Sequence, residues 1–216
     1  MTRQPFSPNY EELQKQYAIG LRSLQYHPEL AASIGRCIAT WSQVDNEIGV
    51  LFGNFLGTNS EAAMAVFSIL RRSSSQIEAL KEASKLCLSE DEITFFDKII
   101  KKYKALEKER NFLAHACYGV AVNRDDILLC IPIKDHIQFQ TKAVIRHLKN
   151  ETVSDHHKEL KENMFVYTKK DLIFLEKEML DFCECILNFN IYLRDDDDSR
   201  KAGNLERVKN YLRIDS

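Results

Sequence analysis

Arg110, Asn111 and His115 are the residues of this sequence whose types and spacing most clearly suggest chemistry. They lie near the end of a segment, from about 91 to 117, whose apolar residues recur with the period of an α-helix. Arg110 falls inside the apolar stripe, so its guanidinium loses water and needs a carboxylate, a phosphate or several other acceptors. Asn111 and His115 are four residues apart and share one side of the helix at the margin of the stripe. We therefore expect an inward-facing arginine beside an imidazole that a ligand can reach.

These three side chains suit the cleavage of RNA without a metal ion, and they are the predicted catalytic residues. A base must deprotonate the ribose 2′-hydroxyl, and histidine, which titrates near neutrality, suits that task. The arginine fork can stabilise the charge that builds on the phosphorus oxygens. Asn111 could fix the histidine tautomer or contact the phosphate. Arg110 and His115 lie about 140° apart around the helix, so the arginine must wrap round or a second subunit must contribute.

The Arg110-Asn111-x3-His115 pattern resembles the motif of the HEPN superfamily, whose members are small helical bundles. The resemblance implies a homodimer in which two motifs face each other across a cleft that cuts single-stranded RNA or tRNA loops without metal. It also implies a toxin–antitoxin or phage-defence effector, with an antitoxin or regulatory protein as partner. Some members only bind nucleotides or have lost activity. The alternative is therefore a non-catalytic bundle that acts as a nucleotide-binding or regulatory protein-interaction module.

Two acidic residues are candidate partners that support Arg110. Asp45 projects from the core-facing side of an earlier helix, although at the edge of that face its carboxylate could instead reach water. Glu107 precedes Arg110 by three residues and can pair with it along the helix. An Arg–Asn–His cluster with such partners could also be purely structural.

The helix that carries the motif has a local excess of positive charge in a chain whose net charge is -2. Because the whole chain has no general attraction for nucleic acid, any RNA contact must be local. Lysines on the outer faces of long helices are also ordinary solvated surface. The candidate RNA-binding residues are Lys101, Lys104 and Lys108.

The composition favours an all-α, or mainly α, protein. Among 216 residues there are seven Gly and four Pro, so long stretches lack the residues that break helices. We expect a multi-helix up-and-down bundle with a small β-hairpin insertion at about 118–132, where turn residues separate two apolar runs. The bundle domain covers 1–194, and 195–216 form an acidic linker and a short C-terminal helix. The expected helices are about 10–25, 29–56, 61–70, 76–88, 91–117 and 168–193, with a strand and a short basic helix possible in 135–152.

The remaining features predict no metal and no cofactor. Six cysteines are scattered without a Cys-x-x-Cys pair, which is typical of reduced thiols in a cytosolic protein. The run Ser154-Asp155-His156-His157 lacks a second cluster of ligands and suits a surface loop. No apolar run approaches the roughly 18 residues that span a bilayer, and the start lacks a secretion signal. We therefore predict a cytoplasmic protein that does not associate with membranes.

Overall fold

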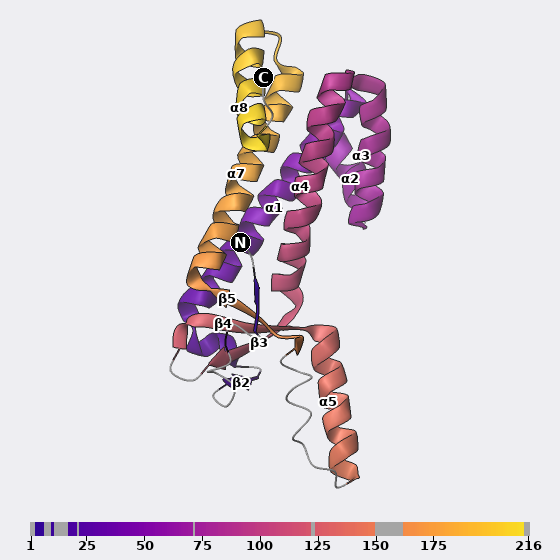
Figure 1. Ribbon diagram of the computed structural model, residues 1–216. Coiled ribbons are helices and arrows are strands. Elements are labelled where there is room, and N and C mark those ends of the chain that lie inside the picture. The colour runs from indigo at the N-terminus through magenta and orange to yellow at the C-terminus, as the bar shows by residue number, and fades with distance from the viewer. Residues whose placement is uncertain are drawn as a thin grey trace. The chain divides into compact units, whose positions relative to one another are not determined.

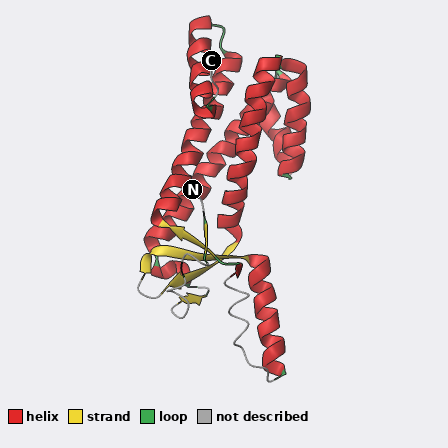
Figure 2. Ribbon diagram, viewed as in Figure 1, coloured by secondary structure: helices red, strands yellow, loops and turns green. Residues whose placement is uncertain are grey.

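The computed structural model describes residues 3–6, 10, 17–20, 22–70, 72–121, 124–149 and 162–213. The chain is mainly helical and carries one small antiparallel sheet, as Figures 1 and 2 show. It divides into two compact units, each made of two chain segments. Unit 1 comprises Met1–Ile38 and Lys108–Lys177, and unit 2 comprises Ala39–Glu107 and Glu178–Ser216.

The described helices include three of 26 residues or more, which run through both units of the chain. The helices are η2 (Ser23–Tyr26, a 3-10 helix), α1 (Pro28–Leu56), α2 (Ser60–Ile69), α3 (Ser73–Cys87), α4 (Glu90–His115), α5 (Ile133–Leu148), α7 (Lys169–Arg194) and α8 (Asp198–Leu212). The strands are β1 (Gln4–Pro5), β2 (Tyr17–Ile19), β3 (Ala116–Ala121), β4 (Arg124–Pro132) and β5 (Phe165–Thr168).

The sheet of unit 1 has the strand order β1-β5-β4-β3-β2, with each neighbouring pair antiparallel. The predicted hairpin is confirmed as β3 and β4, in which Cys117 pairs with Ile131. It is not an isolated insertion, however, because three further strands complete the sheet. One face of the sheet buries a hydrophobic cluster, which explains why the hairpin is stable here although two strands alone would not be. The cluster consists of Phe6, Ala121, Ile127, Leu129, Ile131, Met164 and Val166.

The prediction of a helix over 10–25 is wrong for the part that the structure describes. Residues 17–19 form β2, in which Ala18 pairs with Val120 of β3, and η2 follows. The register places the backbone of β2 very close to Gly119: a Cβ atom there would lie 2.9 Å from the Ala18 carbonyl oxygen. The backbone N–H and C=O groups of β2 form hydrogen bonds with the edge of β3. This pairing joins segments that are distant in sequence, so the periodicity of residues 10–25 does not reveal it.

Ser89 precedes Glu92 by three residues at the start of α4, a Ser-x-x-Glu spacing that predicts a capping box. The Ser89 backbone N–H and hydroxyl donate to Glu92 Oε2 over 2.7 and 2.8 Å, and the Glu92 N–H donates to Ser89 Oγ over 3.4 Å. The helix ends at His115, two residues before the predicted end, because Ala116 starts β3. At this end the Tyr118 hydroxyl donates to the carbonyl oxygen of Leu113, one of the carbonyls that a helix terminus leaves without an intrahelical partner. The predicted apolar stripe is buried at Phe96, Ile99, Tyr103, Leu106 and Leu113.

In unit 2, aromatic side chains of α1 pack against α4. The ring centroids of Trp41 and Tyr103 lie 5.0 Å apart, and those of Phe55 and Phe96 lie 5.2 Å apart. Asn190 of α7 donates to the Glu47 carbonyl oxygen over 3.0 Å, which ties α7 to α1 within the same unit. Helix α8 follows a short acidic connection, as expected, and the Asp197 carboxylate caps its first turn.

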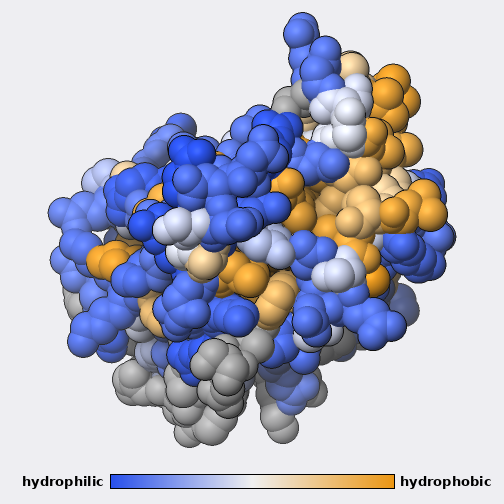
Figure 3. Space-filling view, turned by 90° about the horizontal axis from the view of Figure 1, so that it is seen from above, coloured by the Kyte–Doolittle hydropathy of each residue, from blue (hydrophilic) through white to orange (hydrophobic). Residues whose placement is uncertain are grey.

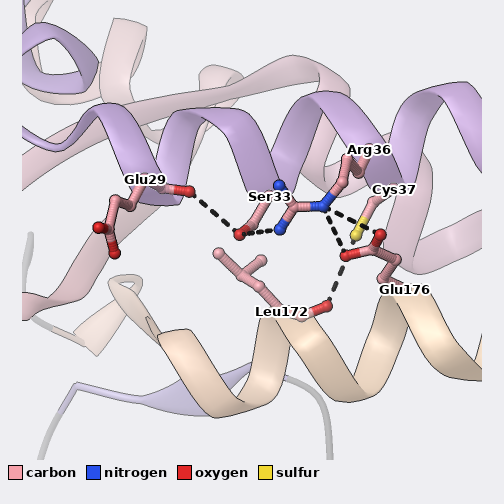
Figure 4. Close-up of polar contacts among 6 residues, drawn as sticks. All are labelled: Glu29, Ser33, Arg36, Cys37, Leu172 and Glu176. Carbon is pink, nitrogen blue, oxygen red and sulfur yellow. Dashed lines mark hydrogen bonds and ion pairs between the residues drawn. The ribbon is translucent and has the colours of Figure 1, made fainter.

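In unit 1, a polar network joins the first turns of α1 to those of α7 (Figure 4). Arg36 Nε donates to both carboxylate oxygens of Glu176 over 3.0 Å, while Arg36 Nη2 donates to Ser33 Oγ over 2.8 Å. The Cys37 thiol donates to the Leu172 carbonyl oxygen over 3.7 Å. Arg36 is half exposed, so this network orients the two helices more than it stabilises them.

Glu92→Gln is expected to lower the free energy of unfolding by about 0.5–2 kcal/mol at pH 7, the usual contribution of a cap. Burial acts to raise the pKa of Glu92, but hydrogen bonds from Ser89 and from the Tyr192 hydroxyl outweigh it and lower the pKa overall. A lowered folded-state pKa stabilises the protein above the carboxyl's ordinary pKa, and this contribution disappears as the pH falls through the folded-state pKa. Urea unfolding should show the gap between wild type and variant narrowing below about pH 5. A gap that stays constant down to pH 3 would contradict this assignment.

Candidate functional site

The last two turns of α4 carry the three predicted catalytic residues, and all three belong to unit 1. Arg110 is half-buried and its Nε atom is shielded from solvent, whereas Asn111 and His115 are exposed. This placement agrees with the helical pattern, which puts the arginine on the apolar stripe and the other two at its margin. A guanidinium and an imidazole with this exposure can respectively hold a phosphate and exchange a proton.

A largely buried ionic network that the sequence did not reveal holds the helix beside the motif. Arg3 Nη2 lies 3.7 Å from Glu109 Oε1, and these side chains are only 16% and 14% exposed. The Tyr167 hydroxyl donates to Glu109 Oε2 over 3.0 Å. Burial, together with the charge and the hydrogen bond of Glu109, raises the pKa of Tyr167 well above its usual value. Glu109, the residue before Arg110, therefore links α4 to the segment that carries Arg3 and to β5.

Aromatic rings complete the surroundings of Arg3. The carbon at the centre of its guanidinium lies 4.0 Å from the ring centroid of Phe112 and 5.1 Å from that of Phe165. Phe112 and Phe165 also contact each other edge to face, with centroids 5.5 Å apart. Cation–π contacts of this kind favour Arg over Lys. Because Phe112 lies inside the predicted motif, the network positions the motif backbone directly.

The predicted supporting residues lie in unit 2. Asp45 is half-buried and accepts a hydrogen bond from the Tyr103 hydroxyl over 3.0 Å. Glu107 is also half-buried. Their pairing with Arg110 stays a prediction.

The predicted RNA-binding lysines, Lys101, Lys104 and Lys108, are all exposed, as either RNA contact or ordinary solvation requires. Their neighbour Lys102 forms an ion pair with Glu178 in unit 2, which reduces the local excess of positive charge. The face of the molecule drawn in Figure 3 is mostly hydrophilic, with hydrophobic residues gathered toward one side. The role of the three lysines in RNA binding stays a prediction.

A cavity of about 290 Å³ lies in unit 1 immediately beyond the motif. Its walls come from β2, η2, β3 and α5, and they include Ile19, Leu24, Ala116, Cys117, His136 and Gln140. The His136 Nδ1 atom is buried and has no hydrogen-bond partner among the residues that the structure describes. No spacing in the sequence singles out His136, because its contribution depends on α5 packing against β3 and β4.

The thiols of the chain and the possible metal ligands among its described residues are the remaining candidates for chemistry. All six cysteines are free. Burial, with a smaller effect of Glu176, raises the pKa of Cys37 to about 12, and burial raises the pKa of Cys185 to about 12, so these thiols stay protonated at neutral pH. Among the described residues, no three His, Cys, Asp or Glu side chains are grouped to hold a metal ion. The Ser154–His157 run lies outside them.

None of the described helices is long and apolar enough to cross a bilayer.

Three comparisons test whether this chain resembles known proteins. No family model matches it, and no curated protein and no solved structure matches it either. The resemblance to the HEPN superfamily therefore continues to depend on the Arg110–His115 motif and on the helix that presents it.

Proposed function

We propose that this protein is a HEPN-like, metal-independent endoribonuclease that acts on single-stranded RNA or tRNA loops. The observation that carries the proposal is the combination, in two turns of α4, of a half-buried Arg110 with exposed Asn111 and His115. In this proposal the helices pack as an up-and-down bundle and the protein is a cytoplasmic toxin or phage-defence effector, controlled by an antitoxin or regulatory protein.

The proposed reaction is an intramolecular transesterification of the RNA backbone. His115 accepts the proton of a ribose 2′-hydroxyl, and the 2′-oxygen attacks the adjacent phosphorus. The bond from phosphorus to the 5′-oxygen breaks, leaving a 2′,3′-cyclic phosphate, and the departing oxygen takes a proton from water or from a second imidazole. Arg110 stabilises the charge on the non-bridging oxygens, and Asn111 orients the imidazole or contacts the phosphate.

A homodimer is part of the proposal because one helix presents Arg110 and His115 in different directions. They are five residues apart, about 140° around the helix, so two copies together could supply both groups to one phosphate. The exposed apolar side chains of α5 support a second copy: Ile137, Val144 and Leu148 are 55%, 59% and 76% exposed, and α5 has no buried residue. Apolar surface of this kind is typical of protein interfaces.

The direct test incubates the purified protein with a single-stranded RNA oligonucleotide and with total tRNA in excess EDTA. We expect cleavage products that carry a 2′,3′-cyclic phosphate and a 5′-hydroxyl, which end-labelling and mass spectrometry identify. A His115→Ala variant purified in parallel controls for contaminating ribonucleases. The absence of cleavage from both substrates, or equal cleavage by the variant, would contradict the proposal.

Arg110→Lys is expected to slow this cleavage by about 10²–10³-fold, the usual cost of removing one electrostatic donor from a transition state. Lysine keeps the positive charge but loses the planar fork that donates two parallel hydrogen bonds to a phosphate. The rate is measured under single-turnover conditions beside Arg72→Lys, which changes an exposed arginine at the start of α3. If both variants cleave at the wild-type rate, Arg110 has no role in the reaction.

A non-catalytic module that binds nucleotides or regulates another protein is the second candidate. It is favoured by the Arg3–Glu109–Tyr167 network, because this network shows that the polar residues around Arg110 include structural ones. Such a module would show nucleotide-dependent thermal stabilisation without RNA cleavage.

A further inference from the structure

The cavity beyond the motif is joined to His115 by the chain itself. Ala116 and Cys117, which line it, are the two residues that follow His115. Because consecutive Cα atoms lie about 3.8 Å apart, the cavity wall begins within one residue of the proposed catalytic imidazole. A molecule in the cavity would therefore contact the residues that directly follow the motif.

Two polar side chains that line the cavity come from one side of α5. His136 and Gln140 are four residues apart, so they project from the same face of this helix. The His136 Nδ1 atom is buried without a hydrogen-bond partner among the described residues, an arrangement that costs free energy in a folded protein. A neutral imidazole has one donor and one acceptor nitrogen, and a carboxamide offers both functions. The two side chains can thus recognise a ligand edge on which donors and acceptors alternate.

The rest of the cavity is apolar and small. Ile19 and Leu24 form part of its wall, and the volume of about 290 Å³ is close to the smallest volumes that are typical of ligand sites. A flat ring system of one or two rings suits this volume, whereas a folded oligonucleotide does not. Around the cavity α5 is basic: four Lys or Arg residues stand against the single acidic residue Asp135 in 133–149. That charge suits a ligand with phosphates attached outside the cavity.

We propose that this cavity binds one nucleobase of the RNA, with His136 and Gln140 contacting its edge and the apolar walls its faces. The inference rests on the proposed function, and it names the part of the substrate that this function leaves undefined. A base held here would be unstacked from its neighbours, which matches a preference for single strands and loops.

The experiment titrates the full-length protein with adenosine, guanosine, cytidine and uridine, with ribose 5-phosphate as a ligand that lacks a base, and measures binding by NMR. We expect at least one nucleoside to bind, and binding at least about tenfold weaker in His136→Ala, because that variant leaves a ligand group unpaired. His147→Ala and Gln138→Ala, on exposed positions of the same helix, serve as matched controls. Gln140→Leu is a second variant on an exposed position, so a folding defect in His136→Ala would not leave the question open.

The base-binding proposal is overturned if no nucleoside binds, if ribose 5-phosphate binds as well as the nucleosides, or if both cavity variants bind like wild type. The outcomes separate this proposal from the nuclease. Nucleoside binding that depends on His136, without any RNA cleavage, would support the cavity assignment and reject the endoribonuclease. RNA cleavage that is unchanged in His136→Ala and Gln140→Leu would support the endoribonuclease and reject the cavity assignment.

Discussion

Replacing His115 with alanine is expected to slow metal-independent RNA cleavage about 10²–10⁴-fold, the range that a positioned general base contributes. Alanine cannot accept the proton of the 2′-hydroxyl, while the phosphate contacts of Arg110 would remain. His115 is exposed at the end of α4, so its removal should leave the thermal melting midpoint within the range of other surface substitutions. Single-turnover cleavage in EDTA, with both proteins at the same concentration, measures the difference.

Two controls make the His115 result specific. His147→Ala removes another exposed imidazole, on α5, and should cleave at the wild-type rate. Free imidazole added to His115→Ala should restore part of the lost rate, because the missing group is a small diffusible base. A variant that keeps full activity would show that the reaction uses a different base or that the activity belongs to a contaminant.

The largest expected effect on stability comes from Glu109→Ala, which should lower the free energy of unfolding by about 3–5 kcal/mol. The substitution leaves the largely buried Arg3 guanidinium without its carboxylate partner and removes the acceptor of the Tyr167 hydroxyl. Tyr167 is fully buried, so water cannot readily replace the lost hydrogen bond. Urea unfolding followed by circular dichroism gives the difference.

Matched variants test whether this loss belongs to the network. Glu78→Ala makes the same change at an exposed position of α3 and should stay within about 0.5 kcal/mol of wild type. Tyr167→Phe removes only the hydroxyl and should cost about 1.5–3 kcal/mol, the usual contribution of a hydrogen bond to a charged group. A double-mutant cycle between Arg3→Met and Glu109→Ala should show a coupling that independent sites lack. A Glu109→Ala variant as stable as Glu78→Ala would contradict the network.

The features that the sequence predicts well are those encoded by neighbouring residues. The capping box of Ser89 and Glu92, the apolar stripe of α4 and the β3–β4 hairpin each depend on spacings of two to four residues, and the structure confirms all three. The other strands are two to four residues long. At that length alternation carries almost no signal, and pairing with distant segments decides the conformation. This is why Tyr17 and its neighbours were expected in a helix.

The candidate site likewise combines features that local spacing predicts with features that depend on distant contacts. Helical geometry was sufficient to predict a half-buried Arg110 and an exposed His115. It could not predict that Arg3, from the first residues of the chain, lies against Glu109, because nothing in their spacing connects them. Glu109 lies at the margin of the apolar stripe, and this position is the local signal for its partial burial. His136 likewise depends on how α5 docks on the sheet.

The strand order has a consequence for synthesis on the ribosome. The two strands translated first, β1 and β2, occupy the two edges of the sheet, and their partners are β5 and β3. At the usual elongation rates, roughly 5–20 s pass between the emergence of β2 and that of its partner. The nascent segment that holds Phe6 and Tyr17 must therefore remain without its strand partners, with these aromatic side chains uncovered, until β3 and β5 have been made. Chaperones that bind exposed aromatic segments would meet this chain during that interval.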